Sequence, residues 1–303
     1  MILLSTGSLR YYGLDRIFGI ARDVGYDGIE LIIDDSVDTV HTRYLNDLSG
    51  REGIPIRAVH APFFFLTPPG WPKSSVVKAE MAVSIAEETG ADVLVLHMPC
   101  LTEDDYIRWM RDGVPALQAR TGVTIAVENM PCAMKPLGRL GARLNLNAFY
   151  YIKRSRLFYR LLSLVSAPVF PVNGWEDFLA FENVVLDTTH MATGGYDLFE
   201  VYRMLGRRIV HIHLSNFDGR EHVSLDEGVL PMGPFLKMLG SDGFGGCITL
   251  EFIPDWIGAE DEGRARAALS RNLRFVRDNL SAGITRKAVD IKELPPVPAV
   301  QQS

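Results

Sequence analysis

Residues 88–99, ETGADVLVLHMP, contain one complete copy of the pattern that decides the fold. Gly90 follows a segment of helical periodicity and is typical of a helix stop. The apolar run Val93–His97 that comes next is typical of a buried parallel strand. This run ends in a polar residue, His97. The order helix, glycine, apolar strand and polar terminator predicts one unit of an α/β fold.

The same unit recurs along the whole chain. The predicted strands are Ile2–Thr6, Gly28–Ile33, Ile56–His60, Val93–His97, Thr124–Glu128, Val184–Asp187, Ile209–His213 and Cys247–Glu251. The segments of helical periodicity are Leu14–Val24, Val37–Arg51, Lys73–Thr89, Glu103–Arg120, Trp175–Phe181, Asp197–Leu205, Pro231–Leu239 and Glu262–Leu280. Eight alternating units predict a single (β/α)₈ TIM barrel over residues 1–282.

A doubly wound open sheet is the alternative fold for such a pattern. It would need a glycine-rich first turn to bind a dinucleotide. The segment after the first predicted strand, in STGSLRYYG, does not fit GxGxxG. We therefore favour the barrel and expect no nucleotide cofactor.

Two segments fall outside a minimal barrel. Residues 131–174, between the fifth and sixth strands, contain no Asp or Glu but many basic and aromatic residues. This insertion is compatible with a lid over an anionic substrate, a nucleic-acid contact, a partner or membrane contact, or a solvated surface excursion. Residues 283–303 are polar and proline-rich, so we expect them to be disordered.

Composition limits the classes of protein. The chain has 303 residues, a net charge of −6 and 47 % hydrophobic residues, which excludes wholesale disorder and disfavours a protein that coats nucleic acid. Three cysteines form no CxxC pair, and neither a signal peptide nor a bilayer-spanning segment is recognisable. We expect a soluble cytoplasmic protein, monomeric or oligomeric.

The polar residues at the strand ends are the candidate functional residues. They are His60, His97, Glu128, Asp187 with His190, His213 and Glu251. A barrel directs its strand ends to one rim, so these side chains are expected to converge. Mixed imidazoles and carboxylates suit Zn²⁺, Mn²⁺ or Fe²⁺ better than Ca²⁺. Glu128 and Glu251 end apolar strands, where an unpaired carboxylate would be costly, so a cation partner is favoured.

His211 lies two residues before His213, so the two face the same side, with His211 one layer deeper. We expect His211 to be a core residue or to support a ligand.

The series His60, His97, Glu128, Asp187-x-x-His190, His213, His222 and Glu251 resembles the xylose isomerase-like barrel superfamily. That group includes endonuclease IV and the sugar-phosphate isomerases and epimerases. The resemblance covers roughly residues 1–280 apart from the insertion, and GYDGIEL and HVSLDEG also resemble the family.

The resemblance to the ketose epimerases implies one divalent metal, Zn, Mn, Mg, Co or Fe. The matching ligands are Glu128, Asp187, His213 and Glu251. In that branch the two glutamates also exchange a proton with the carbon beside the substrate carbonyl. His190 and Arg220 match positions near the substrate oxygens.

The resemblance to endonuclease IV implies three zinc ions that cleave a DNA phosphodiester. His60, His97, His190 and His222 would join the other ligands there. In an isomerase, His60, His97 and His222 would instead hold a second metal or line the pocket. One family ligand, an Asp two residues before the last His, is replaced by Arg220, and a cation at this position disfavours a third zinc. We therefore expect a metal-dependent isomerase or epimerase of a small sugar-like substrate, with a phosphodiesterase acting on abasic DNA as the alternative.

Overall fold

The structure is a computed structural model that describes residues 1–63, 66–98, 104–130, 178–193 and 195–292. Within these residues, eight parallel strands close into a barrel in sequence order, and β1 also pairs with β8. The strands are β1 (Ile2–Ser5), β2 (Gly28–Ile32), β3 (Ile56–His60), β4 (Val93–His97), β5 (Thr124–Glu128), β6 (Val184–Asp187), β7 (Ile209–Leu214) and β8 (Cys247–Leu250). The predicted (β/α)₈ barrel is confirmed, and the predicted insertion 131–174 lies outside the described residues.

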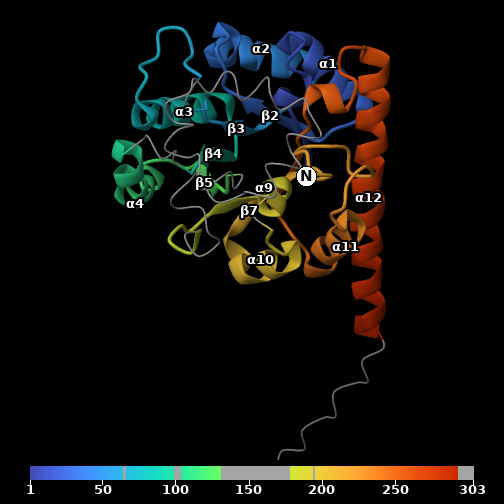
Figure 1. The fold of residues 1–303 in the computed structure, drawn as a ribbon. Helices are drawn as coiled ribbons and strands as arrows, with labels where there is room; N and C mark the ends of the chain where they lie inside the picture. Colours follow the sequence, from blue (N-terminus) through green and yellow to red (C-terminus); the bar gives the residue numbers. More distant parts are fainter. Residues whose placement is uncertain (64–65, 99–103, 131–177, 194, 293–303) are drawn as a thin grey trace, which may run out of the picture.

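Helices surround the barrel (Figure 1). They are α1 (Leu14–Val24), α2 (Thr42–Glu52), α3 (Ser75–Thr89), α4 (Asp104–Gln118), α9 (Thr188–Thr193), α10 (Leu198–Leu205), α11 (Met232–Asp242) and α12 (Glu262–Lys292). Gly90 ends α3 as predicted, with a φ of 69° and its N–H bonded to the last helical turn. The predicted helix 37–51 is instead a 3₁₀ turn, Val37–Val40, followed by α2, because His41 between them has a non-helical backbone.

No helix in the part of the chain that the structure describes has the length and apolarity to cross a lipid bilayer.

Alternate strand residues point into the barrel. They form one apolar cluster inside it, separate from the larger core between strands and helices: Leu3, Ala58, Val93, Val95, Ala126, Val185 and Cys247. His97 lies two residues after Val95, and Glu128 lies two residues after Ala126, so both terminal side chains continue the inward-facing series. The period of two therefore directs the polar strand ends to the inside of the rim.

The last helix extends further than the sequence indicated. α12 continues to Lys292, beyond the boundary expected at Ala282, and Figure 1 shows it running alongside α11 and past it. Gly283 is helical: a Cβ there would lie 2.1 Å from the Lys237 carbonyl oxygen of α11. This glycine allows close helix packing and does not end the helix. The rest of the expected tail, residues 293–303, lies outside the described residues.

Candidate functional site

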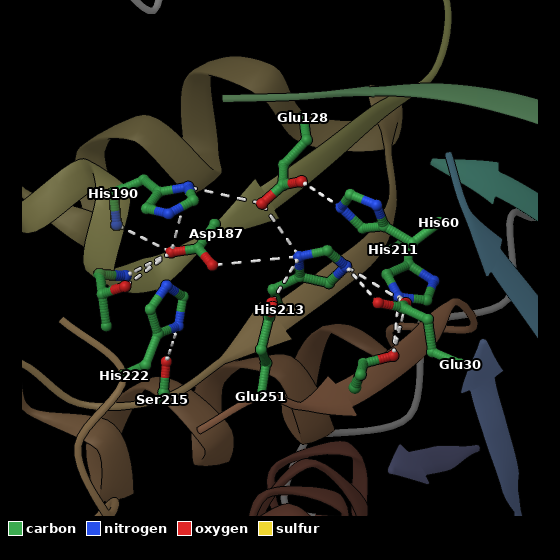
Figure 2. Close-up of polar contacts among 12 residues, drawn as sticks. Glu30, His60, Glu128, Asp187, His190, His211, His213, Ser215, His222 and Glu251 are labelled. Atoms are coloured by element: carbon green, nitrogen blue, oxygen red, sulfur yellow. Dashed lines mark hydrogen bonds and ion pairs between the residues drawn. The ribbon is translucent and has the colours of Figure 1, made fainter. Parts of the chain in front are cut away.

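Glu128 at the end of β5 is the centre of the site, and imidazoles approach both of its oxygens (Figure 2). Its Oε2 lies 3.2 Å from His60 Nε2 and 3.0 Å from His97 Nε2. Its Oε1 lies 3.0 Å from His213 Nδ1 and 3.4 Å from His190 Nδ1. His97 and Glu128 are partners in the register of β4 and β5, which explains why their side chains meet. One buried carboxylate therefore contacts three strand-end histidines and His190 of α9.

The four predicted metal ligands lie together. The ligand atoms of Glu128, Asp187, His213 and Glu251 are all within 4.8 Å of one another. His213 Nδ1 faces all three carboxylates: it lies 3.0 Å from Glu128 Oε1, 3.1 Å from Glu251 Oε2 and 4.0 Å from Asp187 Oδ2. Residues separated by up to 123 positions therefore converge on one point, because each ends a strand of the same closed barrel.

Two further groups flank this centre and share its members. One consists of His60, His97 and Glu128, and the other of Asp187, His190 and His222. In each group the possible ligand atoms also lie within 4.8 Å of one another. His190, which was expected beside the substrate oxygens, therefore also contacts the carboxylates of Glu128 and Asp187.

Local structure holds Asp187 in place. It precedes α9, and its Oδ1 caps the helix by accepting hydrogen bonds from the backbone N–H groups of Thr189 and His190, each at 2.8 Å. Asn129 accepts from the Asp187 N–H at 2.7 Å and donates to the Asp187 carbonyl at 3.1 Å. Asp187 Oδ2 is buried and makes no hydrogen bond within the described residues.

This donor set fits a divalent cation. Three carboxylates and one imidazole suit Mn²⁺, Fe²⁺, Co²⁺ or Zn²⁺. The unbonded Oδ2 of Asp187 points toward His213 in Figure 2, where an ion held by the group would satisfy it. Glu128, Asp187, His213 and Glu251 could therefore bind a metal ion.

The pKa values in the centre of the site are set by neighbouring charged side chains, which outweigh the effect of burial. Burial by itself would raise the pKa of Glu128, but the imidazoles of His213 and His97 outweigh it and hold the pKa well below its usual range. Burial would lower the pKa of His213, but the carboxylates of Glu30, Glu128 and Glu251 raise it well above its usual value. The protons on the imidazoles thus balance the buried carboxylates, a role that a divalent cation can take over.

The two outer histidines differ in charge. Burial lowers the pKa of His97 to about 4, which keeps its imidazole neutral at neutral pH. Burial also opposes the charge on His190, but Asp187 and Glu128 overcome it and raise the pKa of His190 to about 10. Neutral His97 is available as a ligand without losing a proton.

Arg220 is held by its own loop. Its guanidinium bonds to Asp218, with Nη2 2.6 Å from Oδ2, and it lies 4.3 Å from the centre of the Trp256 ring. His222 in the same loop has a left-handed backbone, with a φ of 58°, and its Nδ1 lies 3.1 Å from Ser215 Oγ. The sequence did not reveal the Arg220–Asp218 pair.

Glu30 on β2 is the main site residue that the sequence analysis missed. It is fully buried and bonds to His211 and His213 of β7 (Figure 2). The available signal was the acidic residue inside the apolar run GIELI, which is the same signal that singled out Glu128. His211 lies beneath His213, as the spacing of two predicted.

Comparisons with known proteins agree with the barrel fold. Residues 181–278 match the family model described as xylose isomerase-like TIM barrel. The chain is 28 % identical over 288 residues to an uncharacterised protein of Mycobacterium tuberculosis, with 91 % of this chain and 96 % of that protein covered. It is 29 % identical over 283 residues, with the same coverage, to an uncharacterised protein of Mycobacterium leprae.

Solved structures share the fold. A D-tagatose 3-epimerase-like protein has a TM-score of 0.62 at 18 % identity, with 96 % of this chain and 99 % of that chain covered. The 3-keto-D-glucoside 4-epimerase of E. coli has a TM-score of 0.61 at 14 % identity, covering 91 % and 98 %. An AP endonuclease, family 2, from Brucella melitensis has a TM-score of 0.54 at 16 % identity, covering 88 % and 96 %. The expected resemblance is thereby confirmed: this chain is similar to the xylose isomerase-like TIM barrels.

Proposed function

We propose that this protein is a divalent-metal-dependent isomerase or epimerase of a sugar-like carbonyl compound. One observation carries the proposal: Glu128 and Glu251 both lie within 3.1 Å of the same ligand nitrogen, Nδ1 of His213, with Asp187 beside them. Two carboxylates that share a cation site also lie close to any carbonyl compound bound at that cation. This is the arrangement that proton exchange at the neighbouring carbon requires.

Glu128, Asp187, His213 and Glu251 would hold the metal. When bound, the metal polarises the substrate carbonyl and so acidifies the adjacent C–H bond. Glu251 is the more accessible glutamate, with 14 % of its side chain exposed against 1 % for Glu128. Glu251 would therefore take or return the proton on the rim side. Glu128, surrounded by imidazoles, would exchange it on the inner side.

The test is deuterium exchange. The protein is incubated with Mn²⁺ in D₂O and a panel of ketoses that includes D-tagatose and D-allulose, and mass spectrometry follows deuterium entry beside the carbonyl. We expect exchange with at least one ketose, and a loss of more than about 10²-fold in the Glu251→Gln variant, since the amide can neither accept the proton nor hold the metal as an anionic ligand. Circular dichroism checks that the variant is folded.

The matched control is His41→Gln, which replaces an exposed histidine near the start of α2. It should exchange as the unmodified protein does. Unchanged exchange in Glu251→Gln, or no exchange with any ketose by a metal-loaded protein, would contradict the proposal.

A phosphodiesterase remains the second candidate, because the two flanking groups offer further cation positions around Glu128 and Asp187. Arg220 argues against a phosphodiesterase, because its positively charged guanidinium occupies the position at which the resemblance calls for a carboxylate ligand. Elemental analysis separates the two: one ion per chain favours the isomerase, and two or three ions favour phosphoester chemistry. Cleavage of an abasic duplex, with affinity that falls steeply as salt rises, would establish the second candidate.

A further inference from the structure

A buried polar layer lies beneath the proposed metal ligands. It consists of Glu30 from β2, His211 from β7 and Thr249 from β8, and none of the three is accessible to solvent. Inward-facing positions of a TIM barrel are usually filled by branched apolar side chains. A buried carboxylate at this depth is costly unless several partners satisfy it. This layer therefore requires an explanation in terms of what it contacts.

Glu30 is bonded from three directions. Its Oε2 lies 2.8 Å from His211 Nε2 and accepts a hydrogen bond from Thr249 Oγ1 at 3.0 Å. Its two oxygens lie 3.1 and 3.2 Å from His213 Nε2. Since Glu30 and His213 are 183 residues apart, the carboxylate joins two distant strands.

His213 is therefore contacted at both ring nitrogens. Nε2 faces Glu30, and Nδ1 on the other side of the ring faces Glu128 and Glu251 (Figure 2). A metal-binding histidine needs one nitrogen without a proton, and the partner of the other nitrogen decides which one that is. A carboxylate can only accept a hydrogen bond, so without a metal the carboxylates favour a proton on each nitrogen of His213. A divalent cation held by Glu128 and Glu251 would replace the proton on Nδ1, whereas Glu30, which is not among its ligands, would keep the proton on Nε2.

We infer that Glu30 is a positioning residue for His213: it holds the proton on Nε2, which leaves Nδ1 to bind a divalent cation together with Glu128, Asp187 and Glu251. This inference rests on the proposed metal site. Glu30 touches neither the cation nor the substrate. It acts by fixing the tautomer and orientation of the imidazole, an arrangement that strengthens metal binding in general.

Glu30, His211 and His213 are themselves close enough to be considered as a separate cation group. Two features favour hydrogen bonding instead. The nitrogen–oxygen distances of 2.8–3.2 Å are ordinary hydrogen-bond lengths, and Thr249 supplies the carboxylate with a further donor. The group also has a single carboxylate, whereas the site above it has three.

The test is calorimetric titration of the metal-free protein with Mn²⁺, compared with Glu30→Gln. The amide keeps the size of the side chain and can still accept a hydrogen bond, but it removes the charge. We expect one equivalent of Mn²⁺ to bind in both proteins, with affinity 10- to 100-fold lower in the variant.

Thr249→Val is the matched control. It removes a hydroxyl of the same buried layer that bonds to Glu30 and His211, while the charged contact between Glu30 and His213 is kept. We expect it to destabilise the protein to urea while changing Mn²⁺ affinity less than about twofold. Equal affinity losses in the two variants would show that the effect is merely structural, and would overturn the inference.

The remaining outcomes are distinct. If the unmodified protein binds Mn²⁺ and folded Glu30→Gln binds it equally well, the positioning role is wrong while the proposed function stands. If Glu30→Gln loses a whole equivalent out of two, Glu30 is a ligand and the inference is also wrong. If the unmodified protein binds no divalent metal, the proposed function fails and the inference with it.

A measurement on the unmodified protein covers the case in which Glu30→Gln does not fold. Long-range ¹H–¹⁵N spectra of ¹⁵N-histidine protein loaded with Zn²⁺ report the tautomer of each imidazole, and the His213→Gln variant assigns the signal. We expect a protonated Nε2 and a metal-bound Nδ1 for His213. A proton on Nδ1 would overturn the inference.

Discussion

Asn129 connects the two strands that end in Glu128 and Asp187. It follows Glu128 directly, and its buried amide binds both the N–H and the carbonyl of Asp187, at 2.7 and 3.1 Å. Its own carbonyl accepts a hydrogen bond from His190 Nδ1 at 2.7 Å. A single residue thus sets the spacing between β5 and β6 at the height where the ligands meet. Because Glu128 is the preceding residue, a movement of Asn129 would also move the Glu128 carboxylate.

We predict that Asn129→Ala lowers the free energy of unfolding by about 2–4 kcal/mol, because it leaves two buried backbone groups of Asp187 without partners. Urea denaturation followed by circular dichroism measures the change. Asn46→Ala is the control, since Asn46 also donates to a backbone carbonyl, that of Glu88, but at the surface. That variant should cost less than about 1 kcal/mol. Similar losses in both variants would contradict the role assigned to Asn129.

At the scale of elements, α11 and α12 pack closely through glycines on both helices. A Cβ at Gly240 of α11 would lie 2.2 Å from the Leu280 carbonyl oxygen of α12. A Cβ at Gly283 of α12 would lie 2.1 Å from the Lys237 carbonyl oxygen of α11. Both obstacles are backbone atoms, which cannot move aside as the end of a flexible side chain can. The helices would have to separate to accept any side chain here.

We therefore predict opposite effects for two glycine-to-alanine changes. Gly240→Ala should lower the free energy of unfolding by about 1–3 kcal/mol, because overpacking forces the helices apart. Gly50→Ala, at an open position within α2 where nothing lies within 4 Å of the new Cβ, should raise it by up to about 1 kcal/mol through helix propensity. Equilibrium unfolding in urea measures both. A Gly240→Ala protein as stable as Gly50→Ala would rule out the close packing.

At the scale of the molecule, the barrel and the convergence of its strand ends could be predicted from sequence, because both follow from local periodicity. β3 to β6 have the predicted bounds, and the period of two directs Glu128 and Asp187 inward. What failed depends on contacts between distant segments. Nothing local tells that Glu30 reaches β7, or that Asp218 binds Arg220. A glycine such as Gly283 is typical of a helix end, and only the position of α11 in the fold shows that it allows the two helices to pack closely.

The proposed ligands come from β5 to the end of β8, so a bound ion would join segments spread over the second half of the barrel. Such an ion binds the folded state alone, since no unfolded chain presents the four ligands together. We predict that Mn²⁺ at about 100 times its dissociation constant stabilises the protein by about 2.7 kcal/mol, and that EDTA reverses this. Differential scanning calorimetry should show the increase in Tm.

Comparing the metal-dependent increase in Tm between variants tests which residues bind the ion. Glu251→Gln should lose most of the metal-dependent increase in Tm, because one anionic ligand of the four becomes neutral. His41→Gln should keep it, because His41 lies outside the groups that could hold an ion. An increase of equal size in Glu251→Gln would mean that the cation binds elsewhere. In that case the strand ends meet for another reason, and the carboxylates would be balanced by the protonated imidazoles alone.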